Sequence, residues 1–93
     1  MRRRKHDRTE CRCPIGFRLI VHEESTVRDI HLNGTIVDIC PEGFSIITDY
    51  PLIAGTFITI VEPAAGEIPR YGIVRWVSRT GDEYRAGLSH IAS

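Results

Sequence analysis

Residues 56–61 read Thr-Phe-Ile-Thr-Ile-Val. Five of these six residues are β-branched and the sixth is phenylalanine, and such side chains fit the pleated surface of a β-sheet. Pro51 and Gly55 precede the run and Pro63 follows it, so turn-forming residues bound it on both sides. The stretch therefore predicts a short strand with a turn at each end.

Similar short runs lie on both sides of this strand. Phe17, Leu19 and Val21 follow the period of two that is typical of a strand, and two later runs are joined by a turn at Thr80-Gly81-Asp82. No segment combines an apolar period of 3.6 with helix caps, so any helix should be short. The predicted strands cover residues 15–22, 28–40, 44–48, 56–61, 71–78 and 83–91, a pattern that indicates an all-β barrel or sandwich.

Two turns inside this pattern carry further expectations. Pro41-Glu42-Gly43 predicts a compact turn, because proline presets φ and glycine adopts conformations that other residues avoid. Asn33-Gly34 interrupts the strand over 28–40, and we interpret it as either a bulge or a hairpin turn because the pair tolerates positive φ.

Length and composition indicate one small domain. The 93 residues, 42% of them apolar, leave no room for a second core. The apolar runs are far shorter than the roughly 20 residues that span a bilayer, so we expect neither membrane insertion nor a signal peptide. Three cysteines cannot all pair within the chain, which favours reduced thiols, no disulfides and a cytoplasmic location.

The basic residues are concentrated at the N-terminus. Six of the twelve Arg and Lys residues lie within residues 1–12, against two acidic residues there, although the whole chain has no net charge. Such a segment attracts an anionic partner, but it is equally typical of a solvated tail. We therefore divide the chain into a flexible basic arm, residues 1–12, and a β domain, residues 13–93.

Two separated motifs stand out in the chain. Arg4 to Arg8 has the form RxxxR, and Asp38 to Gly43 has the form DxSxxG with Cys40 in place of serine. Together they resemble the bipartite signature of the PilZ family. The segments 72–77 and 84–88 are similar to the closing strands of that family. The resemblance implies a six-stranded antiparallel β-barrel that binds the bacterial messenger cyclic diguanylate (c-di-GMP), with no catalytic cofactor.

The resemblance places the ligand-binding arginines in the arm. Arg4 and Arg8 are the first candidates and Arg3 is a plausible helper. A planar guanidinium can fork onto the O6 and N7 atoms of guanine, pair with a phosphate through two bonds, or stack on a purine, which lysine does less well.

The remaining site residues come from the second motif. Asp38 would accept hydrogen bonds from N1 and N2 of guanine and so select guanine over adenine. Cys40 points to the same side of the strand as Asp38 but donates only weakly, which predicts up to tenfold weaker binding than serine gives. Gly43 should let the backbone turn tightly and approach the ligand.

Several alternatives accompany this interpretation. Asp38 could instead pair with an arm arginine or cap the turn at Pro41. Val74 and Trp76 lie two positions apart in a predicted strand, so we expect both in the core. Cys11 and Cys13 could lie on one side of a strand, but no second spaced pair completes a zinc site, and we expect no bound metal.

The function that follows is that of a receptor and not of an enzyme. No local motif sets a nucleophile beside a base, and no glycine-rich loop precedes a helix. The chain would pass the c-di-GMP level to an unidentified protein effector in trans. The rivals are a degenerate PilZ adaptor that binds protein but no nucleotide, and a small barrel for single-stranded nucleic acid. Aromatic residues make up only 8% of the chain and do not interleave with the arginines, which argues against the nucleic-acid barrel.

Overall fold

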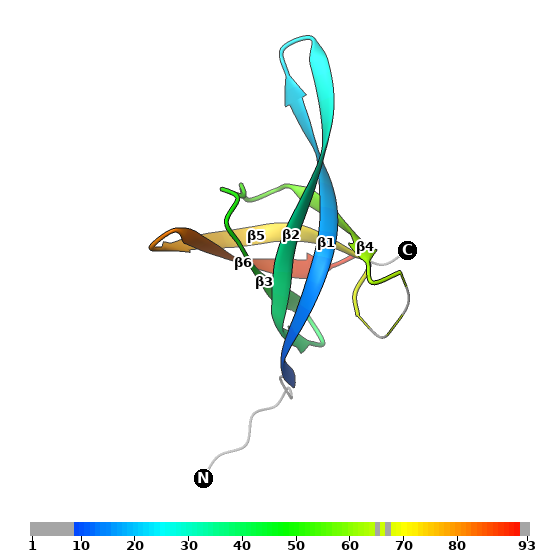
Figure 1. Ribbon diagram of the computed structural model, residues 1–93, viewed down its shortest axis with the longest axis vertical. Helices are drawn as coiled ribbons and strands as arrows, with labels where there is room; N and C mark the ends of the chain where they lie inside the picture. The colour runs from blue at the N-terminus through cyan, green and yellow to red at the C-terminus, as the bar shows by residue number, and fades with distance from the viewer. Residues whose placement is uncertain (1–8, 65, 67, 92–93) are drawn as a thin grey trace.

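Six antiparallel strands close into a barrel (Figure 1). The computed structural model describes residues 9–64, 66 and 68–91. Around the barrel the strands follow the order β1-β2-β3-β6-β5-β4, and β4 pairs with β1 to close it. The prediction of an all-β, six-stranded antiparallel barrel is confirmed. The strands are β1 (Thr9–Glu23), β2 (Thr26–Cys40), β3 (Gly43–Thr48), β4 (Phe57–Glu62), β5 (Tyr71–Thr80) and β6 (Glu83–His90).

The described residues contain no helix that is long and apolar enough to cross a membrane.

The core fills the inside of the barrel. Alternate side chains of each strand point inward, as the period of two requires. Phe17 and Leu19 on β1 are buried there, as the alternation over residues 15–22 predicted. Strand β6 contributes the buried residues Ala86 and Leu88. Each of the other five strands contributes at least one large side chain that is fully buried, and these are Phe17, Ile36, Ile46, Ile58, Ile60 and Val74.

The β1–β2 hairpin is longer than the rest of the barrel. β4 pairs with β1 only over Gly16–Leu19, and β3 pairs with β2 only over Thr35–Cys40. The remainder of the hairpin, up to its turn after Glu23, extends beyond the barrel (Figure 1). β1 also begins at Thr9, well before the expected start, so residues 9–12 of the proposed arm belong to a strand.

The expected interruption at Asn33-Gly34 is wrong. Both residues continue the β1–β2 ladder, with Asn33 opposite Gly16 and Gly34 opposite Ile15, and no register shift occurs there. Glycine is required at position 34 for space and not for a turn. A Cβ on Gly34 would lie 2.8 Å from the backbone oxygen of Ile47 and 3.1 Å from the Phe17 ring.

Candidate functional site

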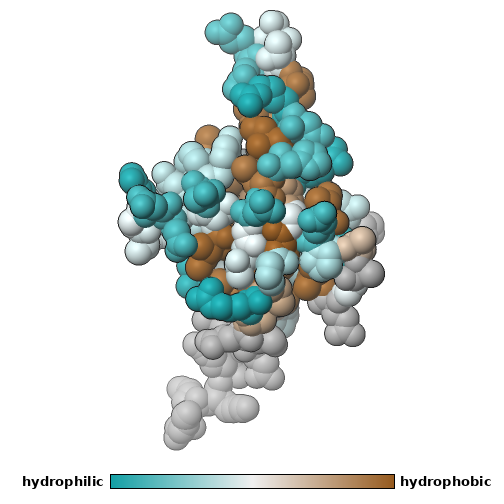
Figure 2. Space-filling view, viewed as in Figure 1, coloured by the Kyte–Doolittle hydropathy of each residue, from teal (hydrophilic) through white to brown (hydrophobic). Residues whose placement is uncertain are grey.

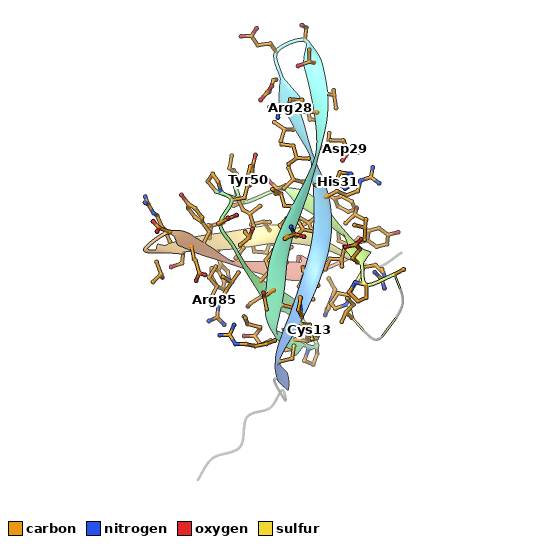
Figure 3. All side chains as sticks on the ribbon, viewed as in Figure 1. Cys13, Arg28, Asp29, His31, Tyr50 and Arg85 are labelled. Carbon is orange, nitrogen blue, oxygen red and sulfur yellow. The ribbon has the colours of Figure 1, made fainter. Side chains whose placement is uncertain are left out.

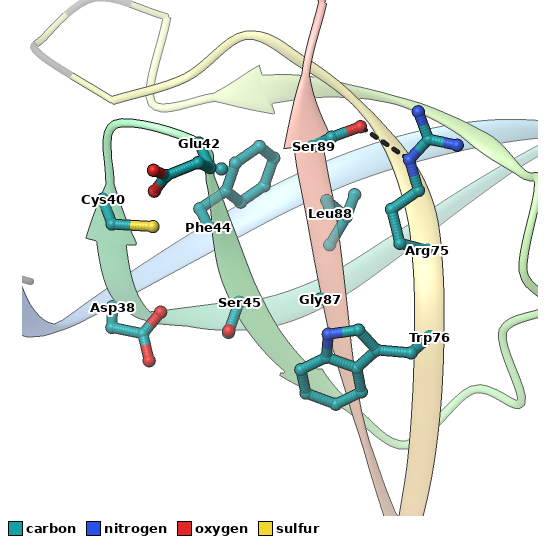
Figure 4. Close-up of a pocket in the computed structure, with 11 residues that line it drawn as sticks. Asp38, Cys40, Glu42, Phe44, Ser45, Arg75, Trp76, Gly87, Leu88 and Ser89 are labelled. Carbon is teal, nitrogen blue, oxygen red and sulfur yellow. Dashed lines mark hydrogen bonds between the residues drawn. The ribbon is translucent and has the colours of Figure 1, made fainter. Parts of the chain in front are cut away.

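One row of residues crosses four strands on the outer face of the barrel. Asp38 on β2 lies opposite Ser45 on β3, Ser45 lies opposite Gly87 on β6, and Gly87 lies opposite Trp76 on β5. This row forms the floor of a shallow pocket of about 280 Å³ (Figure 4). The residues that line the pocket are Asp38, Cys40, Glu42, Gly43, Phe44, Ser45, Arg75, Trp76, Gly87, Leu88 and Ser89.

Asp38 is a buried acid held by a partner from another strand. The residue is only 4% exposed, and its Oδ2 accepts a hydrogen bond from Nη2 of Arg85 at 2.9 Å. Arg85 lies two residues from Gly87 on β6, so its side chain stands on the same face of the sheet. The pair fixes the carboxylate in position and balances its charge. Neither motif of the sequence pointed to Arg85.

Cys40 and Gly43 lie beside Asp38, as their motif suggested. Cys40 is partly buried and its thiol faces the pocket in Figure 4. Gly43 does not have a positive φ, and it is the first residue of β3 and not part of the turn. A Cβ at Gly43 would lie 1.9 Å from the backbone oxygen of Leu88, so glycine is needed here for β3 to approach β6.

The expectation that Trp76 belongs to the core is wrong. Val74 pairs with Leu88, but Trp76 pairs with Gly87, so a bulge at Arg75 adds one residue to β5. The extra residue reverses the alternation of sides. Val74 is therefore buried at 1% exposure, whereas Trp76 is 48% exposed on the outer face.

The Trp76 indole lies flat over Gly87. A Cβ on Gly87 would lie 2.2 Å from the indole nitrogen of Trp76, closer than real atoms approach. The absence of a side chain at position 87 therefore creates the space that the indole occupies (Figure 4). A tryptophan and a glycine on neighbouring strands could have indicated this arrangement. The bulge that places Trp76 opposite Gly87 cannot be read from the sequence, so the pairing was not predictable.

The pocket carries charges of both signs. Asp38 and Glu42 line its β2 end, and Arg75 lines the opposite end. The Nε atom of Arg75 donates to Oγ of Ser89 at 2.9 Å, which holds the guanidinium at the rim (Figure 4). The described pocket therefore provides an acidic acceptor, an aromatic face and one cationic group.

His90 holds the turn that closes the pocket. Its backbone N–H donates to the carbonyl of Glu42 at 3.2 Å, and its Nε2 lies 3.0 Å from the carbonyl oxygen of Cys40. The His90 ring is also tilted against Phe44, with 5.7 Å between the ring centroids. The histidine thus ties the end of β6 to both sides of the β2–β3 turn.

The arm joins the barrel next to this pocket. Thr9 pairs with Ile39, and Glu10 pairs with Asp38. Arg3, Arg4 and Arg8 lie outside the described residues. The described residues do show where the arm is attached. Thr9, which follows residue 8 in the chain, lies opposite Ile39 of the Asp38–Gly43 motif.

Cys11 and Cys13 form a thiol pair on β1 near the same end of the barrel. Sγ of Cys11 donates to the carbonyl of Ile36 at 3.7 Å. Burial raises the pKa of the Cys11 thiol, and the neighbouring Cys13 and the charge of Asp38 raise it further. Within the described ranges, no group of three His, Cys, Asp or Glu residues is arranged to hold a metal ion.

Comparison with known proteins adds no assignment. Neither the models of known protein families nor the sequences of curated proteins give a match to this chain.

Proposed function

We propose that this chain is a cytoplasmic, non-enzymatic receptor of the PilZ type that binds c-di-GMP and passes its level to a protein partner in trans. One observation carries the proposal. Asp38, Cys40 and Gly43 line a single pocket, and the strand that follows the RxxxR motif enters the barrel directly opposite Asp38. The chain that follows the RxxxR motif is thus joined to the barrel beside the second motif.

The pocket has the chemistry to bind one guanine base. The Asp38 carboxylate can accept hydrogen bonds from the N1 and N2 donors of guanine while its Oδ2 keeps the bond to Arg85. The exposed indole of Trp76 offers a flat apolar surface on which a purine can stack. A volume of about 280 Å³ is at the small end for a ligand pocket, so most of a cyclic dinucleotide must lie outside it.

The arm supplies what the pocket lacks. The two phosphates need cationic partners, but among the described residues that line the pocket Arg75 is the only cation, and Arg85 is already paired with Asp38. Arg8 directly precedes Thr9, and Arg4 is five residues before it, within about 18 Å of fully extended chain. Both arginines can therefore reach a dinucleotide whose first base lies beside Asp38. Two guanidinium groups can then pair with the phosphates or stack on the second base.

A second candidate function has one specific observation in its favour. Phe57 and Tyr71 are exposed on the outer face and stack on each other, with 5.9 Å between ring centroids. Together with Trp76, they give the barrel exposed aromatic faces that its composition did not predict. Because bases stack on such faces without sequence preference, single-stranded nucleic acid is the competing ligand.

Calorimetric titration of the full chain distinguishes the candidates. We expect saturable binding of c-di-GMP, weaker or no binding of c-di-AMP, and no binding of a short single-stranded DNA. Replacing Trp76 with Leu should abolish c-di-GMP binding, and replacing Tyr71 with Leu should leave it unchanged. Binding of DNA in preference to c-di-GMP would favour the nucleic-acid module. Binding of neither ligand would favour the degenerate adaptor.

A further inference from the structure

The extended hairpin leaves one strand edge open. On the side of β2 away from β1, pairing with β3 begins only at Thr35, and Oγ1 of Thr48 donates to the carbonyl of Asn33 at 3.0 Å. No other described strand pairs with β2 over Thr26–Leu32 on that side. Where the edge meets the barrel, His31 and Leu32 border a hollow of about 440 Å³ that Asp49 and Glu83 also line. On the opposite edge of the hairpin, Leu19–His22 on β1 faces Tyr50–Ile53 across a hollow of about 270 Å³.

The direction of the backbone groups along this edge follows from its neighbours. In an antiparallel ladder, both polar groups of a residue point to the same side, and successive residues alternate. The carbonyl of Asn33 points toward β3, and the β1–β2 register has no shift between Asn33 and Thr26. The N–H and C=O groups of Val27, Asp29 and His31 therefore point out of the open edge.

Side chains along the edge indicate what could pair with it. Asp29 and His31 stand on one face of the hairpin, and Arg28 stands on the other (Figure 3). Asp29 and His31 are 42% and 67% exposed, respectively. Within the chain, the Asp29 Oδ2 accepts a hydrogen bond from Nη2 of Arg18 at 3.0 Å, and its Oδ1 lies 3.7 Å from Nε2 of His31, so a partner strand would meet a carboxylate that already has these neighbours. Exposed Val27 stands on the same face as Asp29, and hydrophilic and hydrophobic residues are interspersed along the hairpin in Figure 2. Because Asp29 and His31 lie two positions apart, two copies of this edge can pair antiparallel so that the acid of each copy faces the imidazole of the other.

We propose that the chain forms a symmetric dimer in which the open edges of two β2 strands pair antiparallel about Ile30. In this register, Asp29 lies directly opposite His31 of the second copy, and the arrangement occurs twice because of the symmetry. Each such pair exchanges two backbone hydrogen bonds and places a carboxylate beside an imidazole N–H. The two hairpins then form one four-stranded sheet.

The side chains select this register over the neighbouring ones. Pairing about Asp29 would place the two Asp29 carboxylates opposite each other, and like charges in that position are destabilising. Pairing about His31 would place two imidazoles together and leave Asp29 opposite Asn33. A register centred between two residues would place a residue whose N–H and C=O groups point outward opposite one whose groups point toward β1, so the backbone hydrogen bonds could not form. Only the register about Ile30 satisfies both the backbone and the charges.

Charge exchange in trans tests the interface. We expect sedimentation equilibrium of the full chain to show a reversible dimer. Asp29→Lys should weaken it about tenfold by placing a cation opposite an imidazole, and His31→Glu should do the same by placing two acids together. An equimolar mixture of these two variants should recover a heterodimer, because Lys then faces Glu and His31 faces Asp29. Asp82→Lys, which changes an exposed acid in the β5–β6 turn, should behave as the unaltered chain does.

A crosslink tests the register separately. Across the symmetry axis the two Ile30 residues form a non-hydrogen-bonded pair, whose Cα atoms lie about 4.5 Å apart, within disulfide range. Ile30→Cys should therefore give a disulfide-linked dimer under mild oxidation, whereas Leu32→Cys, which faces Arg28 of the second copy, should not. A monomer at chain concentrations up to about 1 mM would overturn the proposal. So would a mixture of the two charge variants that stays monomeric, or equal crosslinking at positions 30 and 32.

Discussion

Arg85 on β6 reaches across β3 to hold Asp38 on β2, with 2.9 Å between its Nη2 and the Asp38 Oδ2. The acid that the sequence singled out for guanine therefore has a barrel arginine as a partner. Its carboxylate is therefore oriented by a residue of the barrel itself. A preoriented acceptor reads a base more selectively than one that must first be ordered.

Replacing Arg85 with Leu should lower both stability and ligand affinity. The Asp38 side chain is 6% exposed, so it would lose a charged partner where water does not readily replace it. Because Arg85 itself is 45% exposed, we expect a modest loss of about 1 kcal/mol in the free energy of unfolding. Arg28→Leu is the control, since its pair with Glu23 is exposed at both ends. Urea denaturation that shows equal effects for the two variants would contradict this account.

Gly43→Ala should destabilise the barrel severely. The added Cβ would meet the backbone oxygen of Leu88, which belongs to β6 and cannot rotate away. We expect a loss of about 3 kcal/mol or more in the free energy of unfolding, measured by chemical denaturation. Gly81→Ala is the comparison, because its Cβ would meet open space and only its φ of 62° opposes a side chain. That variant should lose only about 1–2 kcal/mol.

Gly87→Ala should change the pocket more than the fold. The new methyl group would occupy the place of the Trp76 indole, which is half exposed and free to swing outward. Trp76 is the single tryptophan of the chain, so its fluorescence reports this displacement directly. We expect a shifted emission and at least tenfold weaker c-di-GMP binding. Unchanged emission in a folded variant would show that the indole does not depend on Gly87.

The arm arginines and Cys40 give opposite expectations. Arg4→Ala and Arg8→Ala should each weaken c-di-GMP binding by at least about tenfold, because each removes a charge-assisted contact. Arg2→Ala lies outside the motif and is the control. Cys40→Ser should leave the affinity equal or stronger, since a hydroxyl donates better than a thiol. Titration calorimetry measures the affinity of all four variants. Equal affinities for the three arginine variants would show that the arm contributes only nonspecific positive charge.

The raised pKa of Cys11 predicts a loss of stability in alkali. The folded state holds the thiol proton more tightly than the unfolded chain, for which the usual value is 9.0. The associated stability is present below that pH and is lost as the pH rises through the higher pKa of the folded state. Cys11→Ser should make the alkaline decline shallower in denaturant titrations from pH 8 to 11. An unchanged decline would assign it to another group.

Strand positions followed from the sequence because they depend on local alternation. Residues 56–61 and the two turns after Cys40 and Thr80 were recognisable from β-branched, Pro and Gly residues alone. The failures came from contacts between distant segments. Gly34 resembles a turn residue until the Phe17 ring and the Ile47 backbone are known to cover it.

The candidate site was predictable only in part. Asp38, Cys40 and Gly43 share a local motif, and they do line one pocket. Trp76 was assigned to the wrong face because a bulge is invisible in the alternation of side chains. Arg85 and His90 act across strands that the chain order keeps far apart, so no spacing in the sequence could have indicated them.

The length of the β1–β2 hairpin has one more consequence. A single two-stranded ribbon runs without a break in chain from the residues beside Asp38 to the open edge at Val27. Two-stranded ribbons change their twist more easily than wide sheets do. If the proposed dimer also prefers one twist, a molecule that binds that twist better alters the dimerisation constant by the same factor by which dimerisation alters the affinity for that molecule. A change in the dimerisation constant at the open edge would then report the binding of a ligand beside Asp38.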